Sequence, residues 1–201
     1  MFQYHDRLKS SYDAVIIGAG GHGLAAAYYL ARDYNICNIA VLELGYIGSG
    51  NTGRNTTIIR SNYLTPETVK FYDESVRLWQ DLSADFDLNL FYSTCGHFTL
   101  AHTDDEIKKA CPHMDLTCGG HEPVLGALYH APGSIARHDA VAWGYDRGAD
   151  LRKVEIHQQT EVLGITVESG RITGVQTTKG NISTPKVLCA VAGYTPRIFM
   201  Y

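Results

Sequence analysis

The chain has 201 residues, of which 45% are hydrophobic and 19% are charged, and its formal net charge at pH 7 is -4. This is the composition of an ordinary globular protein of one domain or a domain and a half, and without a basic block neither nucleic acid nor an anionic membrane is expected as the main partner. No apolar run approaches the roughly 20 residues that span a bilayer, and no signal peptide is evident, so a cytoplasmic protein is expected.

The first predicted elements form a strand, a turn, a helix and a second strand. Residues 13–17, DAVII, are continuously apolar, as in a buried parallel strand. The turn GAGGHG follows, then LAAAYYLARD at 24–33, which has the composition of a helix packed close to a sheet, and IAVLE at 39–43. This order predicts a βαβ unit.

Gly18, Gly20 and Gly23 match GxGxxG at the required place, between a strand and a helix. Gly20 leaves room for a pyrophosphate, and the amino end of the following helix favours anions. Glu43 lies 20 residues beyond Gly23, where an acid accepts hydrogen bonds from a ribose diol. A bound adenine dinucleotide is therefore predicted, rather than a glycine-rich turn beside a surface acid.

The Gly, Asn and Thr-rich loop after Glu43 favours FAD over NAD, because a buried flavin needs a second backbone-lined segment.

The middle of the chain begins with an amphipathic helix over residues 65–86, for which Thr65 is the candidate N-cap and Pro66 the first helical residue. Residues 90–103 predict a hairpin or a pair of short strands around Gly96. Residues 104–134 show no long periodic pattern.

Within them Cys111, His113, Cys118 and His121 suggest zinc ligands, but their spacing matches no common module, and free side chains on a loop are favoured. The five cysteines lack a CxxC pair and fit reduced thiols.

The last third predicts a helix within 135–153, which Asp139 is able to cap, and then strands separated by turns at Ser169-Gly170 and Lys179-Gly180. The final apolar strand, VLCAVAG, is expected to rejoin the first sheet. The predicted fold class is α/β, a Rossmann-like FAD-binding βαβ domain with an inserted, incomplete α+β substrate domain. Its expected segments are 1–87 and 134–201 for the FAD-binding domain and 88–133 for the substrate domain.

Three stretches carry a resemblance to a known family: SYDAVIIGAGGHGLAAAYYLAR, GNTGRNTTIIRSNYL and RHDAVAWGYDRGAD. They resemble the beta subunits of heterotetrameric sarcosine oxidases, within the D-amino-acid oxidase-like FAD family. The resemblance implies that FAD binds noncovalently to the glycine turn and Glu43. It also implies that the next loop lines the flavin part of FAD and that the late strands cover the bound cofactor. The residues implied are Gly18, Ala19, Gly20, Gly23, Glu43, Asn51, Thr52, Arg54, Asn55, Thr56, Val162 and Gly193.

Two further roles follow from the same resemblance. Arg60 matches the arginine that binds the substrate carboxylate, a task suited to the two-pronged guanidinium; the alternative is an arginine that is exposed or paired with an acid. His138 matches the histidine that carries a covalent FMN at the interface with a large alpha-like subunit; alone, such a histidine would more often be a cap or a surface residue. The implied reaction oxidises a secondary amino acid such as sarcosine, passing electrons through FAD and FMN to oxygen, which becomes peroxide.

The resemblance also implies missing parts. The family subunit is about twice this length, and the chain stops about where the second half of such a subunit would begin. Between AHTDDE and IKKACP the sequence is shorter than the family by about two dozen residues, the length of a helix and a loop. A noncatalytic module that binds FAD or a partner chain is therefore an alternative to the enzyme. An NAD-dependent dehydrogenase is a third, less favoured because no catalytic dyad stands out.

Overall fold

The computed structural model describes residues 7–63, 65–101 and 126–199. Contacts divide the chain into unit 1, Met1–Thr56, Ala84–Leu90 and Arg137–Tyr201, and unit 2, Thr57–Ser83 and Phe91–Ala136. This division differs from the predicted segments, because it groups most of the helix after Pro66 with the inserted part of the chain. Each unit is described by itself.

Unit 1 is built on a parallel sheet of four strands in the order β12-β1-β2-β8. The strands are β1 (Ala14–Ile17), β2 (Ile39–Leu42), β8 (Glu155–His157) and β12 (Val187–Cys189). Val15 is aligned with Ala40 of β2 on one side and with Val187 of β12 on the other. Both central strands are almost fully buried, which explains their continuous apolar sequences. The structure confirms the predicted βαβ unit and the return of the last strand to the first sheet.

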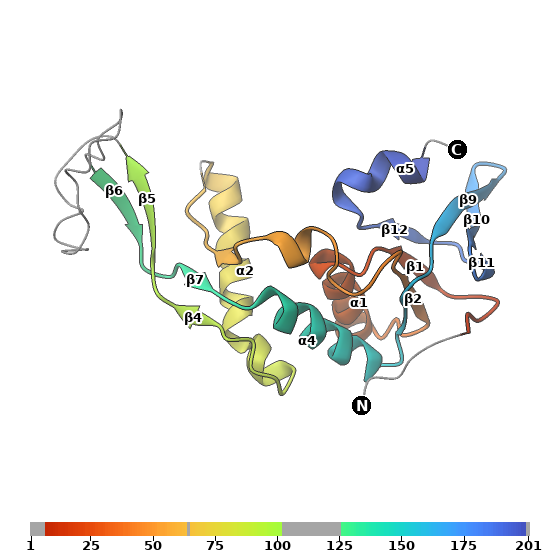
Figure 1. Cartoon of the computed structure of the whole chain (residues 1–201), viewed down its shortest axis with the longest axis horizontal. Coiled ribbons are helices and arrows are strands. Elements are labelled where there is room, and N and C mark those ends of the chain that lie inside the picture. Colours follow the sequence, from red (N-terminus) through yellow and green to blue (C-terminus); the bar gives the residue numbers. More distant parts are fainter. Residues whose placement is uncertain (1–6, 64, 102–125, 200–201) are drawn as a thin grey trace. The chain divides into compact units, whose positions relative to one another are not determined.

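Helices α1 (Gly21–Tyr34) and α4 (His138–Asp150) pack side by side (Figure 1). Tyr28 of α1, Tyr145 of α4 and Phe86 meet edge to face, with ring centroids 5.0 to 5.7 Å apart. Gly144 and Gly148 make this approach possible, since a Cβ atom at either position would lie within 2.8 Å of an aromatic ring atom. Aromatic packing therefore joins the two helices.

Helix α4 begins one residue earlier than its predicted cap. Its N-cap is Arg137, which makes no side-chain capping hydrogen bond, and Asp139 lies inside the first turn. The Asp139 carboxylate accepts the Ala140 N–H at 2.8 Å and pairs with the Arg137 guanidinium. The prediction that Asp139 caps this helix is wrong, because the N-cap is Arg137 and the Asp139 carboxylate accepts the N–H of the next residue within the first turn.

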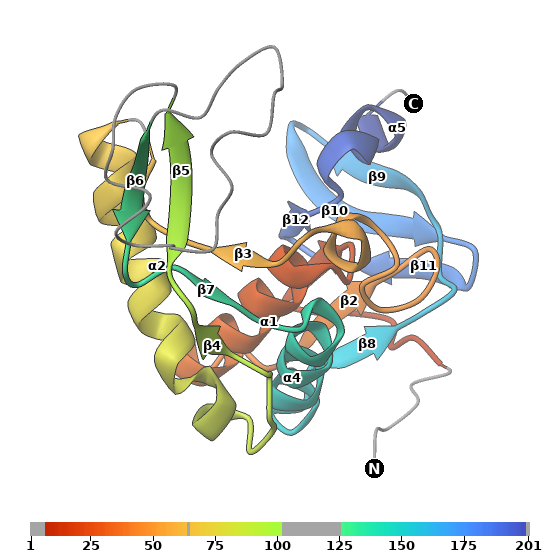
Figure 2. The ribbon, with the colours of Figure 1, turned by 60° about the vertical axis from the view of Figure 1, so that its left-hand side comes forward.

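An antiparallel sheet follows β8, made of β9 (Val162–Glu168), β10 (Arg171–Thr177) and β11 (Gly180–Ser183) (Figure 2). The turn between β9 and β10 holds Ser169 and Gly170 at φ values of 50° and 76°, the left-handed conformation of tight hairpins. Val175 and Ile182 face the core beside Tyr12 and Val15. The chain then forms β12, the 3-10 helix η2 (Ala192–Tyr194) and α5 (Thr195–Phe199).

Unit 2 contains most of α2 (Pro66–Asp85) and short antiparallel strands: β3 (Ile58–Ile59), β4 (Ser93–Thr94), β5 (His97–Ala101), β6 (Gly126–His130) and β7 (Ser134–Ile135). The predicted strands flank Gly96, but they do not pair with each other. β5 pairs with β6, and β4 pairs with β7, which also pairs with β3. The chain around Gly96 thus passes from one small sheet to another and does not form a hairpin. No described helix has the length and apolar character needed to cross a membrane.

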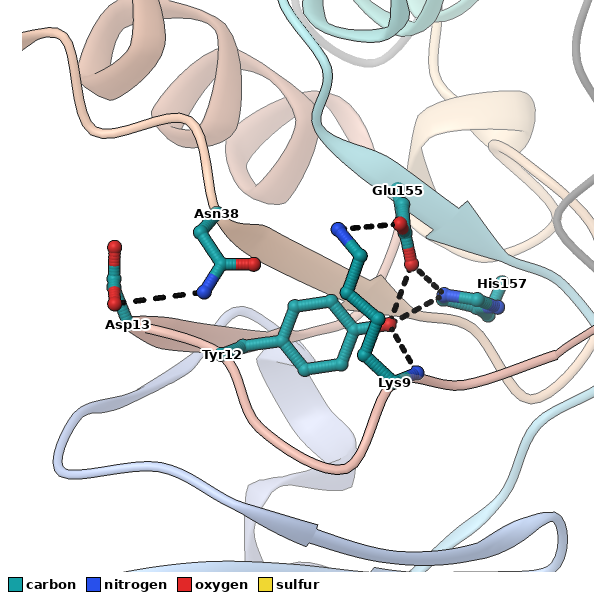
Figure 3. A network of polar contacts seen from close by, with 6 residues as sticks. All are labelled: Lys9, Tyr12, Asp13, Asn38, Glu155 and His157. Atoms are coloured by element: carbon teal, nitrogen blue, oxygen red, sulfur yellow. Dashed lines mark hydrogen bonds and ion pairs between the residues drawn. The ribbon is translucent and has the colours of Figure 1, made fainter.

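A partly buried polar network joins Tyr12, just before β1, to Glu155 and His157 of β8 (Figure 3). The Tyr12 hydroxyl donates to Glu155 at 2.5 Å, and the Lys9 ammonium pairs with the same carboxylate at 2.6 Å. His157, fully buried, places Nε2 3.3 Å from both the Tyr12 hydroxyl and Glu155. Burial opposes ionisation of Glu155, but the hydrogen bonds from Lys9 and Tyr12 outweigh it and hold the pKa of that carboxyl below its usual range.

Replacing Glu155 by Gln is expected to lower the free energy of unfolding at neutral pH by about 2 kcal/mol, because Lys9 and Tyr12 lose a charged acceptor. Since folding lowers the pKa of Glu155 from about 4.5, its contribution is complete above that pH and is lost as the pH falls through the folded-state pKa. The acid side of the stability profile should therefore flatten in Glu155→Gln. Thermal unfolding at several pH values measures this effect.

Glu168→Gln, at an exposed position at the end of β9, is the matched control and should keep the wild-type profile. An acid profile of Glu155→Gln that superimposes on the wild type would contradict the assigned role of this network.

Candidate dinucleotide-binding site

The glycine turn after β1 folds so tightly that two of its residues have no room for a side chain. Gly18 has a φ of +104°, and a Cβ atom there would lie 2.7 Å from the Ala190 carbonyl oxygen. A Cβ atom on Gly23 would lie 1.9 Å from the carbonyl oxygen of Gly18. The first turn of α1 therefore rests directly on the end of β1, and this position requires glycine.

The amino end of α1 has the features of an anion site. Its N-cap is Gly20, which provides no side-chain cap, and the first turn has no acidic residue. The Gly21 N–H donates to Thr52 Oγ1 at 2.8 Å. The N–H groups of a first helical turn have no partners within the helix, and they carry the positive end of its dipole. Phosphate oxygens match this chemistry.

Glu43 binds the glycine turn through its carboxylate. Oε2 accepts the Ala19 N–H at 2.9 Å, and Oε1 accepts the Gly45 N–H at 2.9 Å and contacts the Ser49 hydroxyl at 3.4 Å. Oε2 has a second lone pair with which it can accept a hydrogen bond from a further hydroxyl, whereas Oε1 already accepts from two donors. Glu43 thus lies beside the glycine turn, and the remaining lone pair of Oε2 suits a ribose hydroxyl.

The loop after Glu43 folds back onto the glycine turn. The Gly48 N–H donates to the Ala19 carbonyl at 2.9 Å, and the 3-10 helix η1 (Asn51–Arg54) places Thr52 at the amino end of α1. Asn55 fixes η1 by donating from Nδ2 to the Thr52 carbonyl at 2.7 Å. The loop thus provides mainly backbone and small polar groups beside the turn.

The remaining residues predicted for FAD lie farther from these contacts. Thr56 and Gly193 are exposed, and Val162 packs against the apolar cluster that contains Val175 and Ile182. Ala190 was not predicted, although its N–H donates to the Ile17 carbonyl at 2.8 Å and its own carbonyl faces Gly18. The apolar strand before Ala190 is the signal in the sequence that could have identified it.

A cavity of about 600 Å³ in unit 1 lies between the loop containing η1 and helix α4. His138 and Trp143 of α4 line it together with Arg54, and Lys179 contributes from the turn before β11. Nδ1 of His138 is buried and has no hydrogen-bond partner among the described residues. Burying an imidazole nitrogen without a hydrogen-bond partner is costly, and the residue that carries it lines the cavity, so the cavity is a candidate site.

Arg60 belongs to unit 2, where two kinds of contact hold its guanidinium. The group lies over the Tyr63 ring, 4.7 Å from its centroid, and Nη1 donates to the backbone and side-chain oxygens of Asn62 at 3.3 Å each. Tyr63 in turn stacks on Tyr72 of α2, with centroids 4.1 Å apart. In the part of the chain that the structure describes, no carboxylate pairs with Arg60, which is half-buried.

The candidate zinc ligands, Cys111, His113, Cys118 and His121, lie outside the described residues. Within the described ranges, no group of three or more His, Cys, Asp or Glu side chains is placed to hold a metal ion. Cys37, Cys95 and Cys189 are free thiols, and burial raises the pKa of the Cys189 thiol.

A parallel sheet, a glycine turn and a helix end facing Glu43 together define a dinucleotide-binding protein of the Rossmann type. The family model described as FAD dependent oxidoreductase matches residues 13–200, and the chain belongs to this family. FAD is therefore the cofactor of the family, as the loop after Glu43 predicted.

Two curated relatives are sarcosine oxidase beta subunits. The subunit of Rhizobium meliloti is 44% identical over 94% of this chain, and that of Rhodobacter capsulatus is 41% identical over 93%. The chain spans about half of each relative, 51% of its length. Among solved structures, the L-proline dehydrogenase of P. horikoshii has the same fold, with a TM-score of 0.84 and 24% identity; the match covers 96% of this chain and 56% of that one.

Gly23→Ala is expected to lower the free energy of unfolding of unit 1 by about 3 kcal/mol, because the new methyl group overlaps the Gly18 carbonyl and must separate α1 from β1. Gly21→Ala is the matched control two residues away: its Cβ would lie 3.6 Å from Thr52 Oγ1, an ordinary contact. Chemical denaturation should therefore show a change within about 1 kcal/mol for Gly21→Ala. Equal losses in the two variants would contradict the close packing of the turn.

Proposed function

We propose that this chain forms the FAD-binding part of an oxidoreductase that acts on sarcosine or a related secondary amino acid. The proposal rests on one observation above all, the amino end of α1, whose N-cap Gly20 provides no side-chain cap, beside the Glu43 carboxylate at the carboxyl edge of a parallel sheet. This edge is where open α/β sheets bind nucleotides. The likeness to two sarcosine oxidase beta subunits supports the choice of substrate.

The residues that hold FAD in this proposal divide by chemical role. The N–H groups at the start of α1 bind the pyrophosphate, and the Glu43 carboxylate accepts hydrogen bonds from the ribose hydroxyls. The loop after Glu43 lines the flavin side, while the start of β9 and the 3-10 helix η2, which follows β12, cover the rest. The loop residues are Asn51, Thr52, Arg54, Asn55 and Thr56, and the covering residues are Val162 and Gly193. When bound, FAD supplies the acceptor for the two electrons removed from the amine.

Arg60 binds the substrate carboxylate in this proposal. Its guanidinium is fixed by Tyr63 and Asn62 but has no carboxylate partner among the described residues, so donors remain for an incoming anion. A planar guanidinium accepts a carboxylate in a two-pronged pair, which fixes the orientation of the substrate. Holding the carboxylate at this one point orients the amine and its N-methyl carbon.

His138 holds a second flavin, FMN, in the cavity of unit 1 in this proposal. Its buried Nδ1 has no partner in the described structure, and a cavity of about 600 Å³ adjoins it. A volume of this size is typical of small-molecule cofactor sites. A large alpha-like subunit of a hetero-oligomer is the proposed partner that completes this site. Electrons then pass to FMN and oxygen.

A noncatalytic module that binds FAD or a partner chain is the second candidate. It is favoured by the coverage of the relatives, since the chain spans only 51% of the Rhizobium meliloti subunit. The two candidates differ in one measurable property. An enzyme reduces its bound flavin when sarcosine is added, whereas a binding module retains oxidised flavin.

His138→Ala is expected to abolish any flavin that stays with the protein after acid precipitation, because it removes the imidazole nitrogen proposed to carry FMN. Noncovalent FAD, released by acid, should remain at about one per chain in the variant. Absorbance of the pellet and the supernatant measures both pools. Asp139→Asn alters the next residue in the same cavity and should keep the acid-stable pool. Acid-stable flavin in His138→Ala would refute the assignment.

In Arg60→Gln, the apparent dissociation constant for sarcosine in flavin reduction is expected to rise about 100-fold, because the variant loses a charge-assisted pair with the substrate carboxylate. Stopped-flow absorbance of the FAD-loaded protein gives this value. Arg77→Gln, which removes an exposed guanidinium paired with Glu74 on α2, is the matched control and should behave as the wild type. An unchanged sarcosine dependence in Arg60→Gln would contradict the carboxylate role.

A further inference from the structure

Four side chains of unit 2 form a connected polar cluster around Arg60. Nη1 of Arg60 donates to Asn62 Oδ1 at 3.3 Å. The amide nitrogen of Asn62 donates in the opposite direction, to Thr99 Oγ1 at 2.8 Å and toward His97 Nδ1 at 3.5 Å. Asn62 therefore stands between the guanidinium and two residues of β5, and its two amide ends face different partners.

The orientation of the Asn62 amide depends on whether each neighbouring group donates or accepts hydrogen bonds. The Arg60 guanidinium only donates, so it requires the amide oxygen. Neutral His97 with an unprotonated Nδ1 accepts, so it faces the amide nitrogen. The Thr99 hydroxyl accepts or donates equally well and imposes no direction. With neutral His97 the amide oxygen is thus held against Arg60.

Protonation of His97 reverses one of these requirements. Both ring nitrogens of an imidazolium donate, so the Nδ1–H of His97 then faces the N–H of the Asn62 amide, and two donors oppose each other. Rotating the amide by a half turn lets Oδ1 accept from His97 and from the Thr99 hydroxyl, but it moves the conflict to Arg60, because the amide N–H groups then face the donor Nη1. Nη1 keeps only the Asn62 backbone oxygen at 3.3 Å, and a bound carboxylate oxygen that accepts from it supplies the missing acceptor.

We propose that Asn62 is a positioning residue for the Arg60 guanidinium and that protonation of His97, acting through the Asn62 amide, makes Arg60 bind carboxylates more tightly at low pH. This inference rests on the carboxylate role of Arg60 proposed above. Two effects act in the same direction: a guanidinium N–H is released from Asn62 for the ligand, and a second positive charge appears beside the ligand.

The charged groups around His97 are consistent with this coupling. His130 of β6 lies directly opposite His97 in the strand register, and Arg60 faces it from the segment after β3. Tyr129 of β6 lies beside the neighbouring Gly96. Burial, then Arg60 and His130, lower the pKa of His97 from its ordinary value of 6.5. A carboxylate bound to Arg60 opposes the repulsion by that guanidinium, so binding and protonation strengthen each other.

Formate binding to the full chain tests the proposal, because formate is a carboxylate that stays ionised throughout the range used. The NMR shift of the Arg60 Nε–H gives the dissociation constant, and the His97 ring resonances give its titration midpoint. In the wild type, affinity should rise about fivefold between about pH 8 and about pH 5, and saturating formate should raise the His97 midpoint. A His97 midpoint that formate does not move overturns the proposal without any variant.

Three variants separate the partners. His97→Gln should bind formate with the high-pH affinity at every pH. Asn62→Ala, which releases the same guanidinium N–H at every pH, should bind formate more tightly than the wild type at high pH and should lose part of the pH dependence. His130→Gln removes the neighbouring histidine, which contacts the Ser61 hydroxyl at 3.1 Å. This variant should keep a pH dependence, with its midpoint moved to higher pH because His130 lowers the pKa of His97. A pH dependence that survives in His97→Gln or vanishes in His130→Gln, or an Asn62→Ala affinity equal to the wild type, overturns the proposal.

Arg60→Gln distinguishes this inference from the function on which it rests. If Arg60→Gln binds formate as the wild type does, the carboxylate role of Arg60 fails, and the coupling fails with it. If Arg60→Gln loses binding while Asn62→Ala and His97→Gln match the wild type at every pH, the carboxylate role stands and only the positioning role of Asn62 is refuted.

Discussion

The contact of Gly23 with the Gly18 carbonyl is the constraint on which the candidate cofactor site depends. With no side chain between them, the first turn of α1 lies directly on the end of β1, and a Cβ atom at Gly23 would come within 1.9 Å of the carbonyl oxygen. Helix and sheet are thereby fixed at the edge where the N–H groups of α1 face outward. The anion site is therefore a consequence of backbone packing, and it requires no cationic side chain.

Glu43 adds a negative charge beside this positive helix end, and the hydrogen bonds explain how the two coexist. The carboxylate receives N–H donors from Ala19 and Gly45, so its charge is compensated by the backbone of the turn and of the next loop. One side chain thus joins the end of β2, the glycine turn and the loop that places Thr52 at the start of α1. Such charge-assisted bonds are stronger than neutral ones, and they hold the loop near the site before any ligand arrives.

The sequence predicted what depends on local patterns and missed what depends on distant pairing. The strands around Val15 and Val41, the helix after Gly20 and the place of Glu43 follow from apolar runs and fixed spacing within about thirty residues. The partners of β4 and β5 do not follow from such patterns, because β6 and the start of β7 lie within the stretch 104–134, which shows no long periodicity. A hairpin or a pair of short strands around Gly96 was expected instead. The cavity at His138 is likewise lined by residues that lie far apart in the chain, so no local sequence pattern predicts it.

The two units divide the proposed chemistry according to the kind of anion that each must bind. A dinucleotide carries its charge on a pyrophosphate, which the backbone N–H groups of unit 1 match. An amino acid carries its charge on a planar carboxylate, which the Arg60 guanidinium of unit 2 matches. Since the cation of Arg60 is held by Tyr63 and Asn62 within unit 2, its orientation does not depend on the glycine turn. In the proposed function, cofactor binding and carboxylate binding are thus assigned to different residues, and loss of one does not by itself require loss of the other.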